Sequence, residues 1–317
     1  MRLRDVDFGP VWGASGVQGF FGEGYPFHRF IPGLSFEGMT FVAKTTTLLA
    51  QVGNMPLRED GITPRHLKPS CIKVYPWKGA ALNAVALSGP GAHALLEKGL
   101  WQKRTKPFFL SFGAVAKDRA GRVEELRRFV VLLSAYLPAF RTSIGLQINF
   151  SCPNTGLEQF MLEEVAESLE IASVLGIPLV PKISVLVSVD DARKIAEHPA
   201  CDALCISNTI PWGARPADIR WRTWSSWSMR DTLSPLAQFG GGGLSGAPLF
   251  PLVRHWLKRA GKKEMPKPIC AGGGILAPEQ VLAYAVYGAR AVSIGSVTML
   301  RPWRVKRLIG TAYKHII

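Results

Sequence analysis

Residues 145–185 read GLQINFSCPNTGLEQFMLEEVAESLEIASVLGIPLVPKISV, and the order of the patterns within them predicts the architecture. Two short apolar runs, 145–152 and 179–185, flank a segment at 159–174 in which apolar residues recur with helical spacing. Runs of this length indicate strands, and a strand, a helix and a second strand in succession form a unit with two parallel strands. This unit is the starting point for the rest of the chain.

The same alternation continues in both directions. Further helical segments lie at 122–138, 189–197, 248–260 and 278–288, and the first has one apolar face made by Leu126, Phe129, Val130 and Leu133. Eight candidate strands lie at 39–44, 80–87, 108–115, 145–152, 179–185, 203–209, 268–274 and 291–296. Nearly continuous apolar strands indicate a parallel sheet that is covered on its outside. We therefore predict an α/β fold, namely a (β/α)8 TIM barrel.

A doubly wound open sheet is the alternative fold. That fold usually has a glycine-rich fingerprint after its first strand, whereas Lys-Thr-Thr-Thr occupies 44–47 here. The length of 317 residues suits one barrel with additions, so we predict a single domain over 1–317. Residues 1–38 are expected to form an N-terminal extension that caps the barrel bottom or feeds a loop into the site. Residues 210–242 are expected to form a long loop after strand six.

Composition and charge restrict the class of protein. With 47% hydrophobic and 19% charged residues, the chain can bury a large core. Its five cysteines lack zinc-type pairing, so we predict reduced thiols in the cytoplasm and no metal site. No signal peptide and no run long enough for a transmembrane segment is evident. The net charge of +15 favours an anionic substrate, nucleic acid, phospholipid headgroups or an acidic partner protein.

Polar side chains fall near the carboxyl ends of the predicted strands, where barrel enzymes place their active sites. The residues concerned are Lys44, Asn83, Asn149, Lys182, Asn208 and Thr209. A single Asn often does no more than cap a turn, but amides from several strands indicate a planar polar ligand, because unpaired amides are costly to bury.

Glycines gather in the second half of the chain, at 240–243, 246, 272–274 and 295. Loops after strands seven and eight of a barrel often bind phosphate through backbone N–H groups, and glycine allows the close approach. The placement of these glycines therefore predicts a cofactor that carries a phosphate.

Seven motifs resemble the dihydroorotate dehydrogenase family, in its chain order. They are KTTTL at 44–48, GNMPLR at 53–58, INFSCPNTG at 148–156, SNT at 207–209, GGLSGAPL at 242–249, AGGGI at 271–275 and GARAVSIGS at 288–296. The resemblance covers nearly the whole chain, and SCPN is its most specific element. The related tRNA-dihydrouridine synthases are expected to have GCP at that place.

The resemblance implies bound flavin mononucleotide (FMN) and a set of residues for it. The phosphate would lie on Gly246, Gly273, Gly274, Gly295 and Ser296, and the ring would contact Ala14, Ser15, Gly16, Asn149 and Asn208. Lys182 would lie near the N1/O2 edge of the flavin and Lys44 near O4. The substrate, a small dihydropyrimidine, would be held by Asn83, Asn149, Asn154, Asn208 and Thr209.

The implied reaction is oxidation of dihydroorotate to orotate in pyrimidine biosynthesis, with Cys152, Lys44 and Lys182 as catalytic residues. Oxidising a C–C bond beside a carbonyl requires a base for the acidic proton and a hydride acceptor, here flavin N5. A thiol, with an ordinary pKa of about 8.5, can be that base near neutrality. The soluble members of the family resemble this chain in having Cys there, whereas the membrane-bound quinone-using class has Ser. The resemblance leaves open which electron acceptor is used, whether an electron-transfer subunit takes part, and whether the chain forms a homodimer.

Two departures from the family pattern affect the substrate and the partner. The loop after strand two, usually N-x-x-G-L/F-x-N, has Ala86 and Gly89 in place of Gly and Asn, so the substrate could be a related dihydropyrimidine. Basic residues with tryptophans at 220–227, with basic 254–267 and 301–317, suggest an acidic partner or surface. A tRNA-dihydrouridine enzyme and a non-catalytic flavin-binding barrel are the alternative functions.

Overall fold

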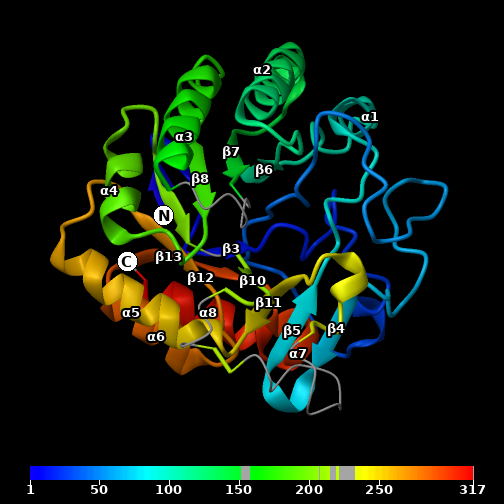
Figure 1. The fold of residues 1–317 in the computed structure, drawn as a ribbon, viewed down its shortest axis with the longest axis vertical. Helices are drawn as coiled ribbons and strands as arrows, with labels where there is room; N and C mark the ends of the chain where they lie inside the picture. The colour runs from blue at the N-terminus through cyan, green and yellow to red at the C-terminus, as the bar shows by residue number, and fades with distance from the viewer. Residues whose placement is uncertain (151–157, 207, 215–218, 221–232, 317) are drawn as a thin grey trace.

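A seven-stranded parallel sheet curls around the centre of the protein, with the order β3-β13-β12-β9-β8-β7-β6. The computed structural model describes residues 1–150, 158–206, 208–214, 219–220 and 233–316 (Figure 1). The strands of this sheet are β3 (Val11–Gly13), β6 (Phe108–Phe112), β7 (Ile144–Asn149), β8 (Leu179–Ile183), β9 (Leu204–Ile206), β12 (Ile269–Gly272) and β13 (Ala289–Ile294).

Segment 40–46 joins the two edges of this sheet. It forms parallel bridges from Thr40 to Trp12 of β3 and from Val42 and Thr46 to β6. Its backbone hydrogen bonds reach both neighbours, for example Thr40 N–H to Val11 O at 2.8 Å and Ala43 N–H to Phe109 O at 2.9 Å. The sheet with this segment therefore forms a TIM-barrel-like fold, as predicted, and a doubly wound open sheet is excluded.

The prediction was wrong about the first two barrel positions. The first barrel strand is β3, inside the segment expected to be an N-terminal extension, and 40–46 occupies the second position. The predicted strand 80–87 contains β5 (Ala80–Asn83), which lies outside the barrel and pairs antiparallel with β4 (Ile72–Tyr75) and β11 (Gly243–Gly246). With only three residues β3 has no recognisable period, and an apolar run does not reveal its pairing partner.

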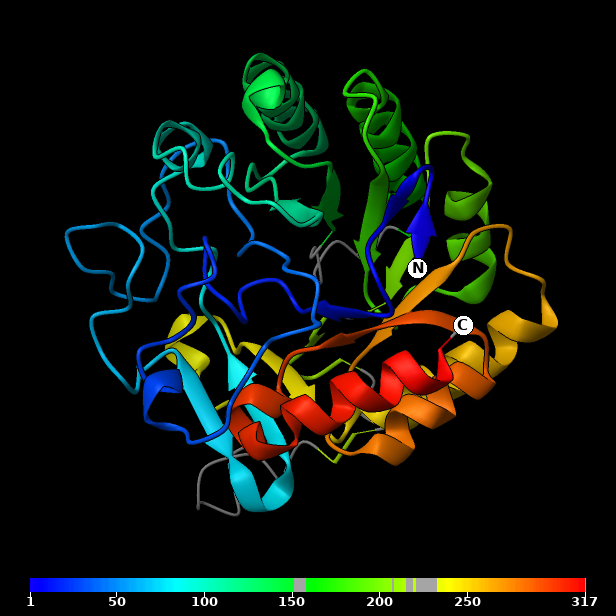
Figure 2. The same cartoon turned by 180° about the vertical axis from the view of Figure 1, so that it is seen from behind.

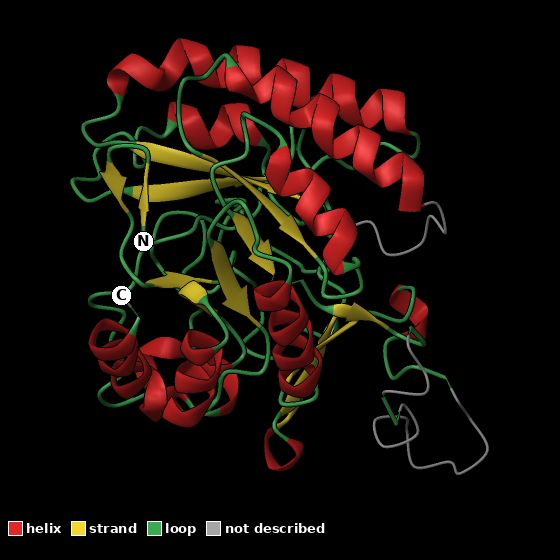
Figure 3. Ribbon diagram, turned by 90° about the vertical axis from the view of Figure 1, so that its left-hand side faces the viewer, coloured by secondary structure: helices red, strands yellow, loops and turns green. Residues whose placement is uncertain are grey.

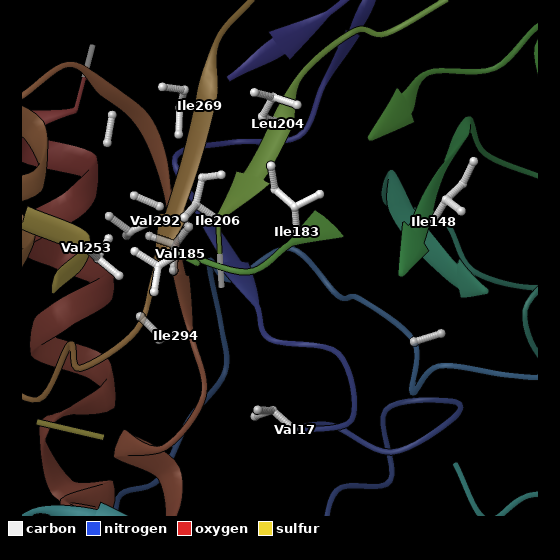
Figure 4. Packing of buried hydrophobic residues seen from close by; sticks show 14 of the residues in the cluster. Val17, Ile148, Ile183, Val185, Leu204, Ile206, Val253, Ile269, Val292 and Ile294 are labelled. Atoms are coloured by element: carbon white, nitrogen blue, oxygen red, sulfur yellow. The ribbon is translucent and has the colours of Figure 1, made fainter. Parts of the chain in front are cut away.

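Helices cover the outside of the barrel, and the strands lie inside (Figure 3). The helices are α1 (Ala92–Glu97), α2 (Arg119–Tyr136), α3 (Glu158–Ser173), α4 (Val189–Glu197), α5 (Leu249–Lys262), α6 (Pro278–Val286), α7 (Val297–Leu300) and α8 (Val305–His315). The predicted face of the first long helix is buried in α2. Alternate strand residues such as Ile183, Leu204, Ile206 and Val292 form the layer between strands and helices (Figure 4).

The other face of the strands fills the barrel near their amino-terminal ends. Trp12, Val42, Phe109, Cys205 and Cys270 form one buried cluster there. An antiparallel hairpin of β1 (Arg2–Leu3) and β2 (Val6–Asp7), visible at the N-terminus in Figure 2, adds Leu3 and Phe8 to the cluster. The start of the chain thus caps the barrel, which is one of the two roles that we expected for 1–38.

Gly145 of β7 gives the Phe109 ring its space within this cluster. A Cβ atom at position 145 would lie 2.4 Å from Cε1 of that ring. Gly145→Ala is therefore expected to lower the free energy of unfolding by about 1–3 kcal/mol, as overpacked cores do. Urea unfolding of Gly145→Ala, Phe109→Leu and the double variant measures the effect. If the double variant is no more stable than the sum of the single effects predicts, contact with the Phe109 ring is not what destabilises Gly145→Ala.

A second sheet lies at the carboxyl ends of the barrel strands, with the order β10-β11-β5-β4. It is antiparallel, and its short strand β10 (Ile210–Pro211) leads out of β9. The sheet brings segment 72–83 against Gly243–Gly246, two parts of the chain that are far apart in sequence. Within the part of the chain that the structure describes, every helix falls short of the length and apolar character needed to span a bilayer.

Candidate active site

A cavity of about 450 Å³ opens where the barrel strands end and the second sheet begins. This volume is in the range of small-molecule sites, and its position is the one that barrel enzymes use. Its walls come from the loop after β3, segment 40–46, the carboxyl ends of β7, β8, β12 and β13, and strands β5 and β11.

The cavity brings together every predicted site residue that the structure describes. These residues are Ala14, Ser15, Gly16, Lys44, Asn83, Asn149, Lys182, Asn208, Thr209, Gly246, Gly273, Gly274, Gly295 and Ser296. Cys152 and Asn154 lie outside the described residues, as do residues 221–227 of the tryptophan-rich segment. Since the residues come from nine separate parts of the chain, their convergence makes this cavity the candidate active site.

Two buried lysines give the cavity its positive charge. Lys44 is 9% exposed and Lys182 8% exposed. Burial lowers the pKa of Lys44 to about 8, partly opposed by the nearby Glu23 and Cys71, and burial also lowers the pKa of Lys182. The Lys44 ammonium donates to the Ser88 carbonyl and lies 4.6 Å from the centre of the Phe20 ring. Both lysines would therefore gain by pairing with an anionic or carbonyl-bearing ligand.

Amide oxygens near the barrel interior lack hydrogen-bond donors. Among the described residues, Asn149 Oδ1 and Gln147 Oε1 on β7 are buried and have no partner. A buried acceptor without a donor costs about 1–3 kcal/mol. Asn149 lines the cavity, so a ligand with an N–H group would stabilise its Oδ1. Asn208 is different, because its Nδ2 donates to Phe150 O at 3.1 Å and Lys182 O at 3.4 Å. Part of its amide therefore holds Phe150, the residue directly after β7, and the end of β8.

A row of hydroxyl groups fixes the loop after β3 to the barrel. Ser15 Oγ donates to Ala43 O at 2.9 Å and lies 2.7 Å from Thr45 Oγ1, which in turn lies 2.9 Å from Ser111 Oγ. The Ala14 N–H donates to Ile294 O on β13 at 2.9 Å. The turn at 14–16 is thus bound to both neighbouring strands and can present its backbone to a flat ligand.

Glycines line another part of the cavity wall, and the close packing there excludes side chains. At Gly246, with φ +98°, a Cβ atom would lie 2.3 Å from Gly79 O. At Gly274, with φ +76°, it would lie 2.6 Å from Phe250 N. Backbone N–H groups that can be approached this closely suit a phosphate group. The fit of these glycines to a phosphate and of the orphaned amides to a planar ring agrees with a flavin nucleotide.

The loop after β5, predicted above as the loop after strand two, departs from the family pattern at Ala86 and Gly89, and the structure explains the change at Gly89. At Gly89 a Cβ atom would lie 2.7 Å from Cζ of Phe20, so the Asn of the family pattern would collide with this ring. Ala86 and Leu87 have φ of 53° and 55°, a left-handed conformation that costs non-glycine residues about 1–2 kcal/mol each. The Lys44 contact with Ser88 and the 2.9 Å hydrogen bonds between Gln51 and Gly89 help to hold the loop in place.

Several residues of the cavity were not predicted. Tyr25, in the aromatic segment expected to feed a loop into the site, lines the cavity, and burial raises its pKa to about 12. Its aromatic neighbours in sequence were the available signal. Ile72, Val85, Leu249 and Met299 also line the cavity, but their apolar side chains look like ordinary core residues in the sequence.

Comparison with known proteins identifies the family. The sequence model described as "Dihydroorotate dehydrogenase" matches residues 6–312. The chain belongs to the dihydroorotate dehydrogenase family. It is accordingly an oxidoreductase that acts on CH–CH bonds, in a family that serves pyrimidine biosynthesis and uses a flavin.

The relatives include enzymes with two different electron acceptors in their names. A dihydroorotate dehydrogenase B (NAD(+)) catalytic subunit from Endomicrobium trichonymphae is 28% identical over 309 residues, which cover 95% of this chain and 86% of the relative. A dihydroorotate dehydrogenase A (fumarate) from Lactobacillus helveticus is 28% identical over 304 residues, which cover 90% and 83%. The crystal structure of the Eimeria tenella enzyme with ferulenol has a TM-score of 0.67 at 18% identity, covering 100% of this chain and 87% of that one, and shows the same fold.

Proposed function

We propose that this protein oxidises dihydroorotate to orotate with FMN as its cofactor. The observation that carries the proposal is the single cavity in which fourteen residues from separate parts of the chain converge. Gly246, Gly273, Gly274, Gly295 and Ser296 would hold the phosphate. Ala14, Ser15 and Gly16 would support the ring through their backbone, and Asn149 Oδ1 would gain the donor that it lacks.

The residues of the chain would divide the chemistry between them. Bound FMN would supply the hydride acceptor. Asn83, Asn154, Asn208 and Thr209 would orient the substrate amides and carboxylate. Cys152 Sγ would remove the proton from the carbon beside the substrate carbonyl. The buried amino groups of Lys44 and Lys182 would donate to negative charge that develops in the cavity.

The electron acceptor and the assembly are part of the same proposal. Names of relatives refer to NAD(+) with a catalytic subunit and to fumarate. We propose the soluble, cysteine-containing class, in the cytoplasm, with an electron-transfer partner. The cysteines that the structure describes are free thiols, as a reducing compartment requires. A homodimer is compatible with this proposal.

Anaerobic mixing tests the substrate. The purified flavin-loaded protein is mixed with dihydroorotate, or with dihydrouracil as the matched compound without a carboxylate, and bleaching of the flavin absorbance is followed. We expect bleaching with dihydroorotate and at least about 100-fold slower bleaching with dihydrouracil. Dihydrouracil lacks the carboxylate and so cannot form its charge-assisted hydrogen bonds, which are worth about 1.5–3 kcal/mol each. Bleaching by dihydrouracil alone would reject dihydroorotate as the substrate.

Product binding should depend on the protonation of Lys44. With a pKa of about 8, the protonated fraction of this lysine falls about tenfold between pH 7 and pH 9. An anion that pairs with the ammonium binds well below this pKa and weakly above it, so the Kd of orotate is expected to rise about tenfold over that range. Titration calorimetry at both pH values measures the change. The Lys44→Met variant should bind weakly without this dependence, and an equal dependence in that variant would show that another group titrates.

A further inference from the structure

Tyr25 brings a hydroxyl group to the cavity wall that the proposed function does not use. The residue lies in the segment between β3 and Thr40 and lines the cavity together with Lys44 and Asn83. Its hydrogen bonds to residues that the structure describes involve only its backbone. Because burial raises the pKa of Tyr25 to about 12, the hydroxyl keeps its proton at neutral pH and can donate it to a ligand.

Contacts with neighbouring residues fix the position of the Tyr25 side chain. Its ring stacks on Phe27, with centroids 5.8 Å apart, and meets the His28 ring edge-on, also at 5.8 Å. The Tyr25 N–H donates to His28 Nδ1 at 3.2 Å, and the His28 N–H donates to Tyr25 O at 2.9 Å. Burial lowers the pKa of His28 to about 4, so the imidazole is neutral and its Nδ1 remains an acceptor. The phenol is thus held in place before a ligand binds, which reduces the entropy cost of binding through it.

The segment that carries Tyr25 lies beside Lys44. The Phe20 N–H donates to Glu23 at 2.8 Å, and the Phe20 ring lies 4.6 Å from the Lys44 ammonium. Glu23 and Cys71 both act on the pKa of Tyr25 and on the pKa of Lys44, which requires the two side chains to be near the same groups. Tyr25 and Lys44 therefore belong to the same part of the cavity wall.

This part of the wall suits an anionic group. Among the described residues that line the cavity, the basic side chains are Lys44 and Lys182, and Asp and Glu do not occur. A neutral hydroxyl beside a buried amino group offers hydrogen-bond donors, and no lining carboxylate repels a ligand carboxylate. An uncharged pyrimidine ring would gain less from such a pair, because hydrogen bonds to charged groups are the stronger ones.

The change at Gly89 gives a second reason to expect a donor from this segment. The family pattern has Asn at this position, and a Cβ atom there would lie 2.7 Å from Cζ of Phe20. Tyr25 follows Phe20 by five residues in the same segment. The segment that excludes an amide side chain at position 89 thus supplies a hydroxyl group to the cavity.

We propose that the Tyr25 hydroxyl donates a hydrogen bond to the carboxylate of the substrate, a proposal that rests on the proposed function. Tyr25 is then a substrate-binding residue that favours dihydropyrimidines with a carboxylate over uncharged ones. Loss of the hydroxyl should weaken the binding of the carboxylate compound and leave the binding of the uncharged ring unchanged.

Titration of the flavin-loaded protein with orotate and with uracil, followed by flavin absorbance, tests this proposal. Tyr25→Phe keeps the ring and its contacts with Phe27 and His28 but lacks the hydroxyl. The matched control is Tyr136→Phe, which removes the hydroxyl of a half-buried tyrosine of α2 that does not line the cavity. We expect the Kd of orotate to rise at least about tenfold in Tyr25→Phe and less than about threefold in the control. The Kd of uracil should change less than about threefold in both variants.

Three results would overturn the proposal. These are an orotate Kd that Tyr25→Phe leaves unchanged, an equal rise in the Kd of uracil, which would place the contact on the ring, and a wild type that does not bind orotate. Flavin content and urea unfolding verify that both variants are intact. If dihydroorotate bleaches the wild type while Tyr25→Phe binds orotate normally, only the role of Tyr25 is refuted. If the wild type is neither bleached by dihydroorotate nor able to bind orotate, the proposed function is refuted as well.

Discussion

In Cys152→Ala, dihydroorotate should bleach the flavin about 10²- to 10⁴-fold more slowly than in the wild type, while the variant keeps its bound flavin. The expected loss is the usual contribution of a positioned general base. The proton to be removed lies beside a carbonyl, and Lys44, with a pKa of about 8, is mostly protonated at neutral pH and cannot accept it unless it first loses a proton. Stopped-flow absorbance under anaerobic conditions measures the rate, and the flavin-to-protein absorbance ratio measures cofactor content.

Two further variants make this result specific. Cys201→Ala removes a thiol that is buried away from the cavity, with its Sγ 3.5 Å from Ala203 O, and should bleach at the wild-type rate. Cys152→Ser retains a group that can move a proton, but at a much higher pKa, so it should recover activity only as the pH is raised. Rapid bleaching by Cys152→Ala would refute the assignment of the base.

Gly246→Ala should raise the Kd of FMN by at least about tenfold, which corresponds to 1.4 kcal/mol. The added Cβ would lie 2.3 Å from Gly79 O, which accepts a 2.8 Å hydrogen bond from Ala247 N–H. Relief of this contact has to separate β11 from β5 at Gly246 and Ala80, where the cavity needs the backbone. Titration of the apoprotein with FMN measures the change, and urea unfolding measures the accompanying loss of stability, expected at about 1–3 kcal/mol beyond the backbone effect.

Gly288→Ala is the matched control for the backbone effect. Gly288 also has a left-handed φ, +88°, but a Cβ atom there would meet nothing within 4 Å. The free energy of unfolding of Gly288→Ala should fall only by the cost of a left-handed conformation, about 1–2 kcal/mol, and the variant should bind FMN normally. If both variants bind FMN equally, contact at Gly246 does not shape the cofactor site.

The parts of the fold that were predictable are those with a long local pattern. Helix α4 begins and ends where the sequence predicts, because Ser188 caps it by accepting from the Asp191 N–H and its apolar residues keep helical spacing. Strand β3 was missed because three residues carry no period, and β5 was assigned to the wrong sheet because its partner β11 is 160 residues away. Pairing over such distances is a property of the tertiary structure.

The site was predictable where it depends on the ends of parallel strands. Asn149 and Lys182 are in register on β7 and β8, so their convergence follows from the topology. The Phe20 ring beside Gly89 could not be deduced, because it is held by loop contacts such as Trp101 Nε1 to Phe20 O at 2.5 Å. For Tyr25 the aromatic residues around it were the only signal in the sequence.

The pairing of β3 with β13 has a consequence during synthesis. Val11 pairs with Val292, about 280 residues later, so the first barrel strand cannot find its neighbour until almost the whole chain has left the ribosome. At 5–20 residues per second this takes roughly 14–56 s. Throughout that time Val11 lacks its partner strand β13, so we expect the nascent chain to depend on chaperones. A circular permutant that places β13 directly before β3 should need less of their help.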